Sequence, residues 1–403
     1  MKRNFKKLIG KIHLWLGLTS GLVVFILGIT GCIWAFEEEI RPWIYSDKLF
    51  VHPPTEQNQH RALSKNLDAA QQVLLPGYRI QRMTIHKDPE RTQLFRHYTR
   101  DTTNRGVWYW NEAEYSQSVY INPYSSEVVA AENPEFAFFN VVLWMHWSLL
   151  LKNEIGQPIV GMATIIFVIM LITGLVLWWP RNKASRKQRV WFRWKPTTKW
   201  KRKNYDLHNI LGFYSMFLVI FIALTGLMWA FTWFNDGVKW IADGGKTIEN
   251  TSMKIKSTVT ASSAVVPLDI VYNTLRTDHA EAEVYYIGLP QDSTGTIGAY
   301  VEYEDRTKTV YQQYDQYSGK LLHTGGRWEE KTNGEKLSAL NYDIHVGAIG
   351  GLVGKTIAFF LSLFAASLPV TGFMIWYGRK FKKRKRKSIG RKKTTTLNPS
   401  RIS

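Results

Sequence analysis

Four long apolar segments, almost free of charged residues, limit the possible folds of this 403-residue chain more than any other feature. They cover residues 12–36, 158–179, 207–234 and 352–378. Each is at least as long as the roughly 20 residues that a helix needs to cross about 30 Å of hydrocarbon. The sequence therefore predicts an integral membrane α-helical protein with four transmembrane helices.

Basic residues gather beside these segments. Residues 1–11, 181–203 and 379–403 contain 28 of the 52 Lys and Arg residues and no Asp or Glu. Basic flanks stay in the cytoplasm, so both termini and the loop between the second and third helices are expected to be cytoplasmic. Because topology alone explains these basic runs, we expect no nucleic acid as a partner. The C-terminal run "RKFKKRKRK" is expected to contact anionic membrane lipid.

The apolar segments repeat. The first and third match at a constant offset of 195 residues, in His13 and His208, Gly17 and Gly212, Thr30-Gly31 and Thr225-Gly226, and Trp34-Ala35-Phe36 and Trp229-Ala230-Phe231. The second and fourth match in Gly156 and Gly354, Thr173-Gly174 and Thr371-Gly372, Trp178 and Trp376, and Arg181 and Arg379. His146 and His345 align as well, after a one-residue shift in the connecting turn. These matches predict two parallel span–loop–span repeats, related by an axis along the membrane normal. The lipoprotein-like box "ITGC" (29–32) overlaps the repeat, so we expect it to be a chance match.

The two long loops are predicted to form small extracytoplasmic α+β modules. They contain short alternating runs such as "QSVYIN" and "GAYVEYE", which are typical of strands, and candidate helices at 62–74 and 267–275. The expected division of the chain is a cytoplasmic N-terminus at 1–11, transmembrane helices at 12–36, 158–179, 207–234 and 352–378, extracytoplasmic modules at 37–135 and 235–340, outer interfacial segments at 136–157 and 341–351, a basic cytoplasmic loop at 180–206 and a basic cytoplasmic tail at 379–403.

Four of the ten histidines lie at matched positions near the ends of the apolar segments. His13 and His208 are expected at the cytoplasmic ends of the first and third helices, and His146 and His345 towards the outer ends of the second and fourth. An interfacial histidine can be a simple anchor, like Trp or Tyr. An ionisable group within a span is nevertheless a functional hypothesis by default, and two symmetric pairs favour a function. The other six histidines have no matched partners: His52, His60, His86, His97, His279 and His323.

The residues around the cytoplasmic pair favour a flat ligand. Gly17 and Gly212 each follow a histidine by four residues, one turn further along the same helix face. A small residue there leaves room for b-type haem held by two histidines from two helices. Zinc prefers three or four ligands, and no carboxylate lies near these histidines within the spans. The single cysteine, Cys32, excludes an intramolecular disulfide and a cysteine-based metal site.

Two other features of the spans have ordinary structural interpretations. The Thr-Gly pairs are typical of close helix packing. Tryptophans near the span ends are typical of an interfacial belt; they are Trp34, Trp178, Trp179, Trp229 and Trp376.

The His-x-x-x-Gly openings, the Thr-Gly pairs that precede Trp, the "LWWPR" ending and the span–loop–span layout resemble the PepSY-associated transmembrane proteins over about residues 8–380. That family comprises iron-regulated proteins of the bacterial inner (cytoplasmic) membrane and includes di-haem reductases that release iron from ferric siderophores on the periplasmic side. The resemblance implies PepSY-like outer modules and two b haems. It also implies that His13, His208, His146 and His345 are the axial ligands of the haem iron.

The function that follows from this resemblance is transmembrane reduction of a ferric siderophore, or another ferric chelate, by electrons from an unidentified cytoplasmic donor. No dinucleotide or flavin motif is present, so the donor would be a separate molecule, which the basic loop at 181–203 could dock. One alternative is a non-enzymatic sensor or protease regulator that acts through its outer modules. A transporter is a further alternative, although broken helices with central polar groups are missing.

Overall fold

The structure is a computed structural model that describes residues 3–54, 59–180, 183–247, 255–258 and 265–390. Within these residues, four helices are long and apolar enough to cross a membrane. They are α1 (Arg3–Trp34), α6 (Asn153–Trp178), α8 (Trp200–Ala230) and α13 (Gly351–Gly390). The chain is thus an integral membrane helical protein, as predicted.

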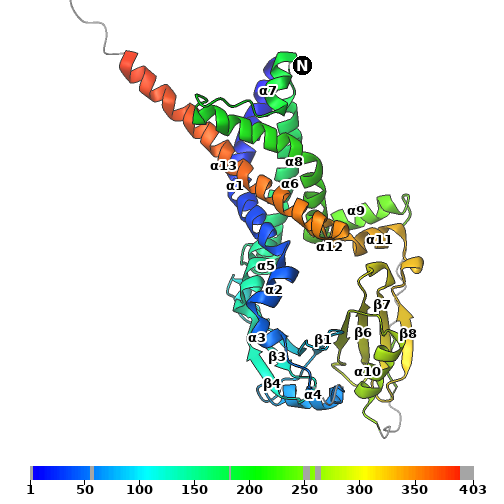
Figure 1. Cartoon of the computed structure of the whole chain (residues 1–403). Helices are drawn as coiled ribbons and strands as arrows, with labels where there is room; N and C mark the ends of the chain where they lie inside the picture. Colours follow the sequence, from blue (N-terminus) through cyan, green and yellow to red (C-terminus); the bar gives the residue numbers. More distant parts are fainter. Residues whose placement is uncertain (1–2, 55–58, 181–182, 248–254, 259–264, 391–403) are drawn as a thin grey trace, which may run out of the picture.

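The four long helices form one bundle (Figure 1). Helix α1 contacts α6 and α13, and α8 contacts the same two helices, so the order around the bundle is α1, α6, α8, α13. Large apolar side chains such as Leu22, Phe221 and Val353 are exposed on its surface. Lipid tails solvate such side chains as well as a protein core does, so the bundle needs no further cover within a membrane.

Two of the long helices extend beyond the apolar segments. Helix α1 begins at Arg3, within the basic leader, and α13 runs to Gly390, within the basic tail. Lys and Arg are good helix formers, so the helical backbone continues past the point where the apolar sequence ends. The apolar segments therefore marked the spans but not the ends of these helices.

Shorter helices lie in the segments between the long helices. They are α2 (Glu37–Ile44), α3 (Ser46–Leu49), α5 (Phe138–Ser148), α7 (Lys183–Val190), α9 (Thr232–Ala242), α11 (Asn333–Ala339) and α12 (Asn341–Val346). Lys355, the charged residue within the apolar part of α13, is paired with α2: its Nζ lies 2.6 Å from Glu38 Oε2 and 2.9 Å from Glu39 Oε1.

The two long loops together build one antiparallel sheet. Its strands are β1 (Arg82–His86), β2 (Gln93–Arg100), β3 (Ala113–Ile121), β4 (Val128–Glu132), β5 (Val284–Gly288), β6 (Thr296–Glu302), β7 (Val310–Asp315) and β8 (Leu321–Gly325). The strand order is β4-β3-β2-β1-β5-β6-β7-β8. Each loop supplies four consecutive strands, and the two halves meet where β1 pairs with β5, from Arg82 opposite Gly288 to His86 opposite Val284.

Two helices lie against this sheet, close to the two places where the sequence predicted them. They are α4 (Leu63–Gln71) and α10 (Pro267–Asp278). Alternate strand residues, among them Ile85, Phe95 and Ile287, pack with Leu63 and Val271 in one buried core. This core crosses the boundary between the halves, so the two predicted modules form one continuous domain.

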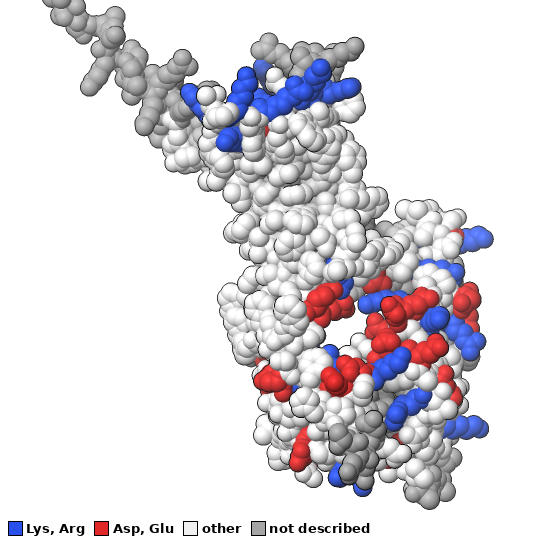
Figure 2. Space-filling model, viewed as in Figure 1, with Lys and Arg blue, Asp and Glu red and all other residues white. Residues whose placement is uncertain are grey.

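Charge divides the molecule into two ends (Figure 2). Lys and Arg gather on the bundle at the end remote from the sheet, which we name the basic end. A band with neither charge follows, and beyond it both charges surround an opening between the bundle and the sheet. We name this second end of the bundle the sheet end.

Candidate functional site

The structure brings the four matched histidines together as two pairs. His13 of α1 and His208 of α8 form the basic-end pair, with ring centres 6.4 Å apart and ring planes at 88°. His146 of α5 and His345 of α12 form the sheet-end pair, with ring centres 6.1 Å apart and ring planes at 72°. Each pair therefore takes one histidine from each half of the chain.

Every histidine of the two pairs bonds to a threonine on a neighbouring helix. The Nδ1 atom lies 2.9 Å from a threonine Oγ1 in four matched contacts: His13 with Thr173, His146 with Thr30, His208 with Thr371, and His345 with Thr225. Each of these hydroxyls also lies 2.7–2.9 Å from the backbone carbonyl oxygen four residues earlier in its own helix.

These contacts fix the tautomer of each imidazole. A hydroxyl has one proton to donate, and in these helices a carbonyl oxygen, which can only accept, takes it. The threonine oxygen must then accept from the histidine, so Nδ1 carries the proton. Each Nε2 is left with its lone pair, the form in which imidazole binds a metal.

The glycine that follows each threonine makes room for the same ring. A Cβ atom built on Gly31, Gly174, Gly226 or Gly372 would lie 3.2–3.4 Å from Cε1 of the histidine that the preceding threonine bonds. Such contacts are tighter than most Cβ atoms make, so any larger residue would displace the ring. Each of the four Thr-Gly pairs thus positions one histidine ring, through a hydrogen bond to the threonine and close packing at the glycine.

The Thr-Gly pattern alone indicates close helix packing and does not predict the contact with the histidines. The signal was available, since the pairs are as numerous as the matched histidines and recur in both halves of the chain. The second half adds a further contact: Asn204 and Asn341, each one turn before its histidine, donate from Nδ2 to the carbonyl oxygens of Thr371 and Thr225 at 3.0 and 3.1 Å. Ile9 and Val142 occupy the equivalent positions of the first half.

The sheet-end histidines sit on short helices that are held by tight turns. Helix α5 ends in the left-handed residue Leu149, with φ 57°, and α12 ends in Gly347, with φ 80°. A Cβ atom on Gly156 would overlap the carbonyl oxygen of Ser148, and one on Gly354 would overlap that of Gly347. These two glycines let α6 and α13 begin directly against the short helices, which explains why both halves have glycine there.

Burial keeps the sheet-end imidazoles neutral. It lowers the pKa of His146 to about 4 and that of His345 to about 3, and the neighbouring His146 contributes to the shift of His345. Both rings are therefore uncharged near neutral pH, which is the form that ligates metals. The indole of Trp229 packs edge-on against His345, with ring centres 5.2 Å apart.

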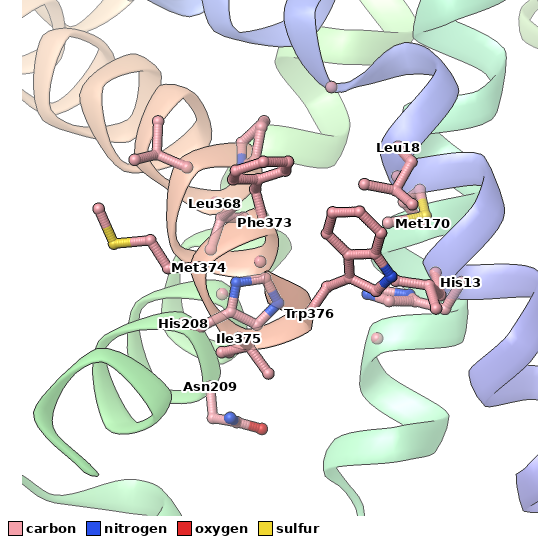
Figure 3. A pocket seen from close by; sticks show the side chains of 18 of the residues that line it. His13, Leu18, Met170, His208, Asn209, Leu368, Phe373, Met374, Ile375 and Trp376 are labelled. Carbon is pink, nitrogen blue, oxygen red and sulfur yellow. The ribbon is translucent and has the colours of Figure 1, made fainter. Parts of the chain in front are cut away.

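The basic-end pair borders a large cavity of about 1960 Å³. Its walls are mostly apolar and come from all four long helices; Figure 3 shows His13 and His208 there with Met170, Phe373 and Trp376. Gly17 and Gly212, predicted to leave space for a flat ligand, both line it. A Cβ atom would come within 2.8 Å of Met170 Cε at Gly17 and 3.4 Å of Leu368 Cδ2 at Gly212.

The interfacial-belt interpretation does not hold for Trp178. This side chain is buried, lines the same cavity and stacks on Phe213, with ring centres 3.6 Å apart and ring planes at 5°. Trp179, the next residue, is exposed, as a belt residue should be.

The donor set suits a metal that takes two protein ligands. Among the described residues, no group of three or more His, Cys, Asp or Glu side chains could hold a metal ion. Zinc sites use three or four such ligands, whereas haem takes two axial ligands from the protein. Four of the other histidines contact residues of the domain that contains the sheet instead; they are His60, His86, His97 and His279.

Comparison with known proteins agrees with the membrane-spanning bundle. A search of curated proteins found no match. A family model described as the PepSY-associated TM region matches residues 11–379, which include all four spans and both histidine pairs. The chain therefore belongs to the family of PepSY-associated transmembrane proteins.

Proposed function

We propose that this protein is a di-haem b reductase of the bacterial inner membrane. It would pass electrons from a cytoplasmic donor to a ferric siderophore, or a similar ferric chelate, on the periplasmic side and release ferrous iron. The observation that carries this proposal is the pair of imidazoles near each end of the bundle, with ring centres 6.4 and 6.1 Å apart.

This spacing fits two imidazoles on opposite sides of one metal. A metal–nitrogen bond of about 2 Å and about 1 Å from nitrogen to ring centre place the two centres about 6 Å apart. The threonine contacts leave Nε2 as the available nitrogen, and an acceptor on Nδ1 fixes a ligating ring and raises its basicity. The cavity beside His13 and His208 is apolar and large enough for a macrocycle.

Haem, when bound, supplies one-electron transfer. The chain contributes the rest: His13 and His208 would hold one haem, and His146 and His345 the other. Thr173, Thr371, Thr30 and Thr225 keep the four imidazoles in place, and the apolar side chains around them exclude water.

We further propose the topology that the charges favour. The basic end is cytoplasmic, both termini included, and the sheet lies in the periplasm. The chain is organised as two parallel span–loop–span repeats whose loops are PepSY-like modules. The identical contacts of the four histidines support this proposal, because each contact in one half has a counterpart in the other.

The sheet end is where we place the ferric chelate. The opening between bundle and sheet lies at this end and is surrounded by charges of both signs (Figure 2). Oxygen-rich chelators hold ferric iron much more strongly than ferrous iron, so reduction there would release the metal. The Lys and Arg residues of the basic end (Figure 2) would dock an acidic electron donor.

The test is vectorial iron reduction. Inside-out membrane vesicles would enclose a ferric siderophore and a ferrous-specific dye, with a membrane-impermeant reductant outside, at the cytoplasmic face. Wild-type protein should colour the dye, while His345→Ala should stop this reaction and still allow a haem at the basic end to be reduced. His323→Ala, which changes a histidine of strand β8, should behave as wild type. A wild-type rate in His345→Ala would contradict the proposal.

A further inference from the structure

We propose that Lys201 and Arg379 bind the two carboxylates of a macrocycle in the basic-end cavity, so that its acidic edge faces the basic end. This inference rests on the proposed function, because the amphiphilic dicarboxylate in question would be haem. Lys201 and Arg379 belong to neither the histidine motif nor the glycine motif of the two halves.

The lining of the cavity has the polarity of such a ligand. Most of its walls are aliphatic or aromatic, and its charged members are Lys201, Arg379 and Lys380. None of the described Asp or Glu residues lines it. An apolar cavity with cations and no acidic residue suits a molecule with an apolar body and an anionic edge.

The two proposed anchors stand at the same level of the bundle. Lys201 precedes His208 by seven residues in α8, and Arg379 follows Gly372, which contacts the same His208, by seven residues in α13. At a rise of 1.5 Å per residue, both lie roughly 10 Å from the imidazole towards the basic end. Helices α8 and α13 pack against each other, so the two cations approach one edge of the cavity from two directions.

A difference between the halves shows why Lys201 is available. At the repeat offset of 195 residues its counterpart is Lys6, whose Nζ donates to the carbonyl oxygen of Trp179 at 3.0 Å. Helix α6 ends at Trp178, and the last carbonyls of a helix lack partners within it. Lys6 satisfies one of them.

The second half offers no such carbonyl. Tyr377 is the counterpart of Trp179, but α13 continues to Gly390, so the carbonyls near Tyr377 are used within the helix. Within the described part of the chain, Lys201 and Arg379 have no hydrogen-bonding or ion-pairing partner, whereas Lys380 lies over the ring of Trp376 at 4.9 Å. Lys201 and Arg379 can therefore pair with a bound carboxylate, as ammonium and guanidinium groups do.

These cations should raise the reduction potential of the haem they contact. Removing one leaves a carboxylate without its counter-charge, and that negative charge favours the ferric state. An exposed ion pair contributes about 0.2–1 kcal/mol. At a fixed ambient potential, Lys201→Gln or Arg379→Gln should therefore lower the ratio of reduced to oxidised basic-end haem up to about fivefold.

The experiment is an optical redox titration of purified full-length protein in the His345→Ala background, where only the basic-end haem is expected. Lys201→Gln, Arg379→Gln and the double variant should lower the potential, with the largest shift in the double variant. Lys201→Arg should keep the wild-type value. Lys203→Gln is the matched control, because Lys203 lies two residues away on α8 and does not line the cavity.

The outcomes separate this inference from the proposed function. A double variant that binds haem with an unchanged potential would overturn the anchoring role and leave the proposed function intact. Loss of co-purified anionic phospholipid without a change in potential would also overturn it, because the cations would then hold lipid. Wild-type protein without any haem would instead defeat the proposed function.

Discussion

The two histidine pairs share their immediate contacts and differ in their supports. At both ends, Nδ1 meets a threonine of a neighbouring helix and the ring rests on the following glycine. The basic-end histidines lie within α1 and α8, two long helices of the bundle, beside a large cavity. The sheet-end histidines lie on short helices held by tight turns. The contacts that position the imidazoles are thus the same at both ends, while the surroundings of the two pairs differ.

The charged residues near the two histidine pairs also differ. The cavity of the basic-end pair is lined by cations alone among the described charged residues. Near the sheet-end pair, Asp343 lies two residues before His345, and its Oδ1 is 3.3 Å from Nε of Arg306. Burial raises the pKa of Asp343. The two sites should therefore respond differently to substitutions outside their shared contacts.

The largest expected effect comes from removing a ligand. Under the proposed function, His13→Ala or His208→Ala should abolish haem at the basic end, and His146→Ala or His345→Ala haem at the sheet end, because both imidazoles of a pair would hold one haem. A pyridine haemochrome assay should give one haem per chain in each variant and two in the wild type. His52→Ala is the control, and full haem content in all four variants would refute the ligand assignment.

The second-largest effect is expected from substitutions in the turns that support the sheet-end histidines. Gly156→Ala or Gly354→Ala places a methyl group on a backbone carbonyl oxygen of the preceding turn, so α5 or α12 must move away from its span. We expect loss of most sheet-end haem with the basic-end haem retained. Gly237→Ala is the control, because Gly237 lies within α9, does not line the basic-end cavity, and a Cβ atom there would meet no atom of another element within 4 Å. Equal loss of the two ferric haem signals in electron paramagnetic resonance would show that the supports are not separate.

Removing a threonine acceptor should have an intermediate effect on haem affinity, of similar size at both ends. Thr371→Val and Thr225→Val keep the side-chain shape but leave a buried Nδ1–H without its acceptor. Loss of such an outer partner lowers metal affinity by about 10–100-fold, which a haem-transfer assay to apomyoglobin can measure. Thr164→Val is the control, because the Thr164 hydroxyl bonds only Val160 of its own helix among described residues. Unequal losses at the two ends would break the similarity between the sites.

The smallest effect is expected from substituting the glycines of the Thr-Gly pairs. Gly372→Ala and Gly226→Ala put Cβ at 3.2 and 3.4 Å from the imidazole Cε1, so each ring must shift by a few tenths of an ångström. Haem should stay bound, while the electron paramagnetic resonance signal of the matching ferric haem should move. The signal of the other haem serves as the internal control. Unchanged signals in both variants would mean that the rings have more freedom than these contacts imply.

Much of this architecture could be predicted from the sequence, because it depends on local pattern. Span length and charge position identify the four helices, and the alignment of the two halves identifies which histidines correspond. The threonine partners were missed because hydrogen bonds between helices depend on helix rotation, which the apolar pattern of a membrane span leaves undefined. Thr30 lies 116 residues from His146 and Thr173 lies 160 residues from His13.

The joining of the two modules into one sheet could not be predicted from the sequence either. Strands β1 and β5 each have the alternation expected of a strand, but alternation does not say which strand pairs with which. Their pairing connects residues about 200 positions apart, such as Thr84 and Tyr286. Likewise, the beginning of α1 at Arg3 follows from helix propensity beyond the membrane, a part of the helix that an apolar window does not detect.

The β1–β5 seam has an evolutionary consequence under the proposed two-repeat organisation. A half-length ancestor with one module would have exposed β1 as an unpaired sheet edge, which readily pairs with another chain. It would also have held only one histidine of each pair. A symmetric homodimer would have covered that edge and completed both pairs at once, since a two-fold interface brings each surface against its own copy. Gene duplication and fusion would then have freed the halves to diverge, so that Lys6 and Lys201 could acquire different roles.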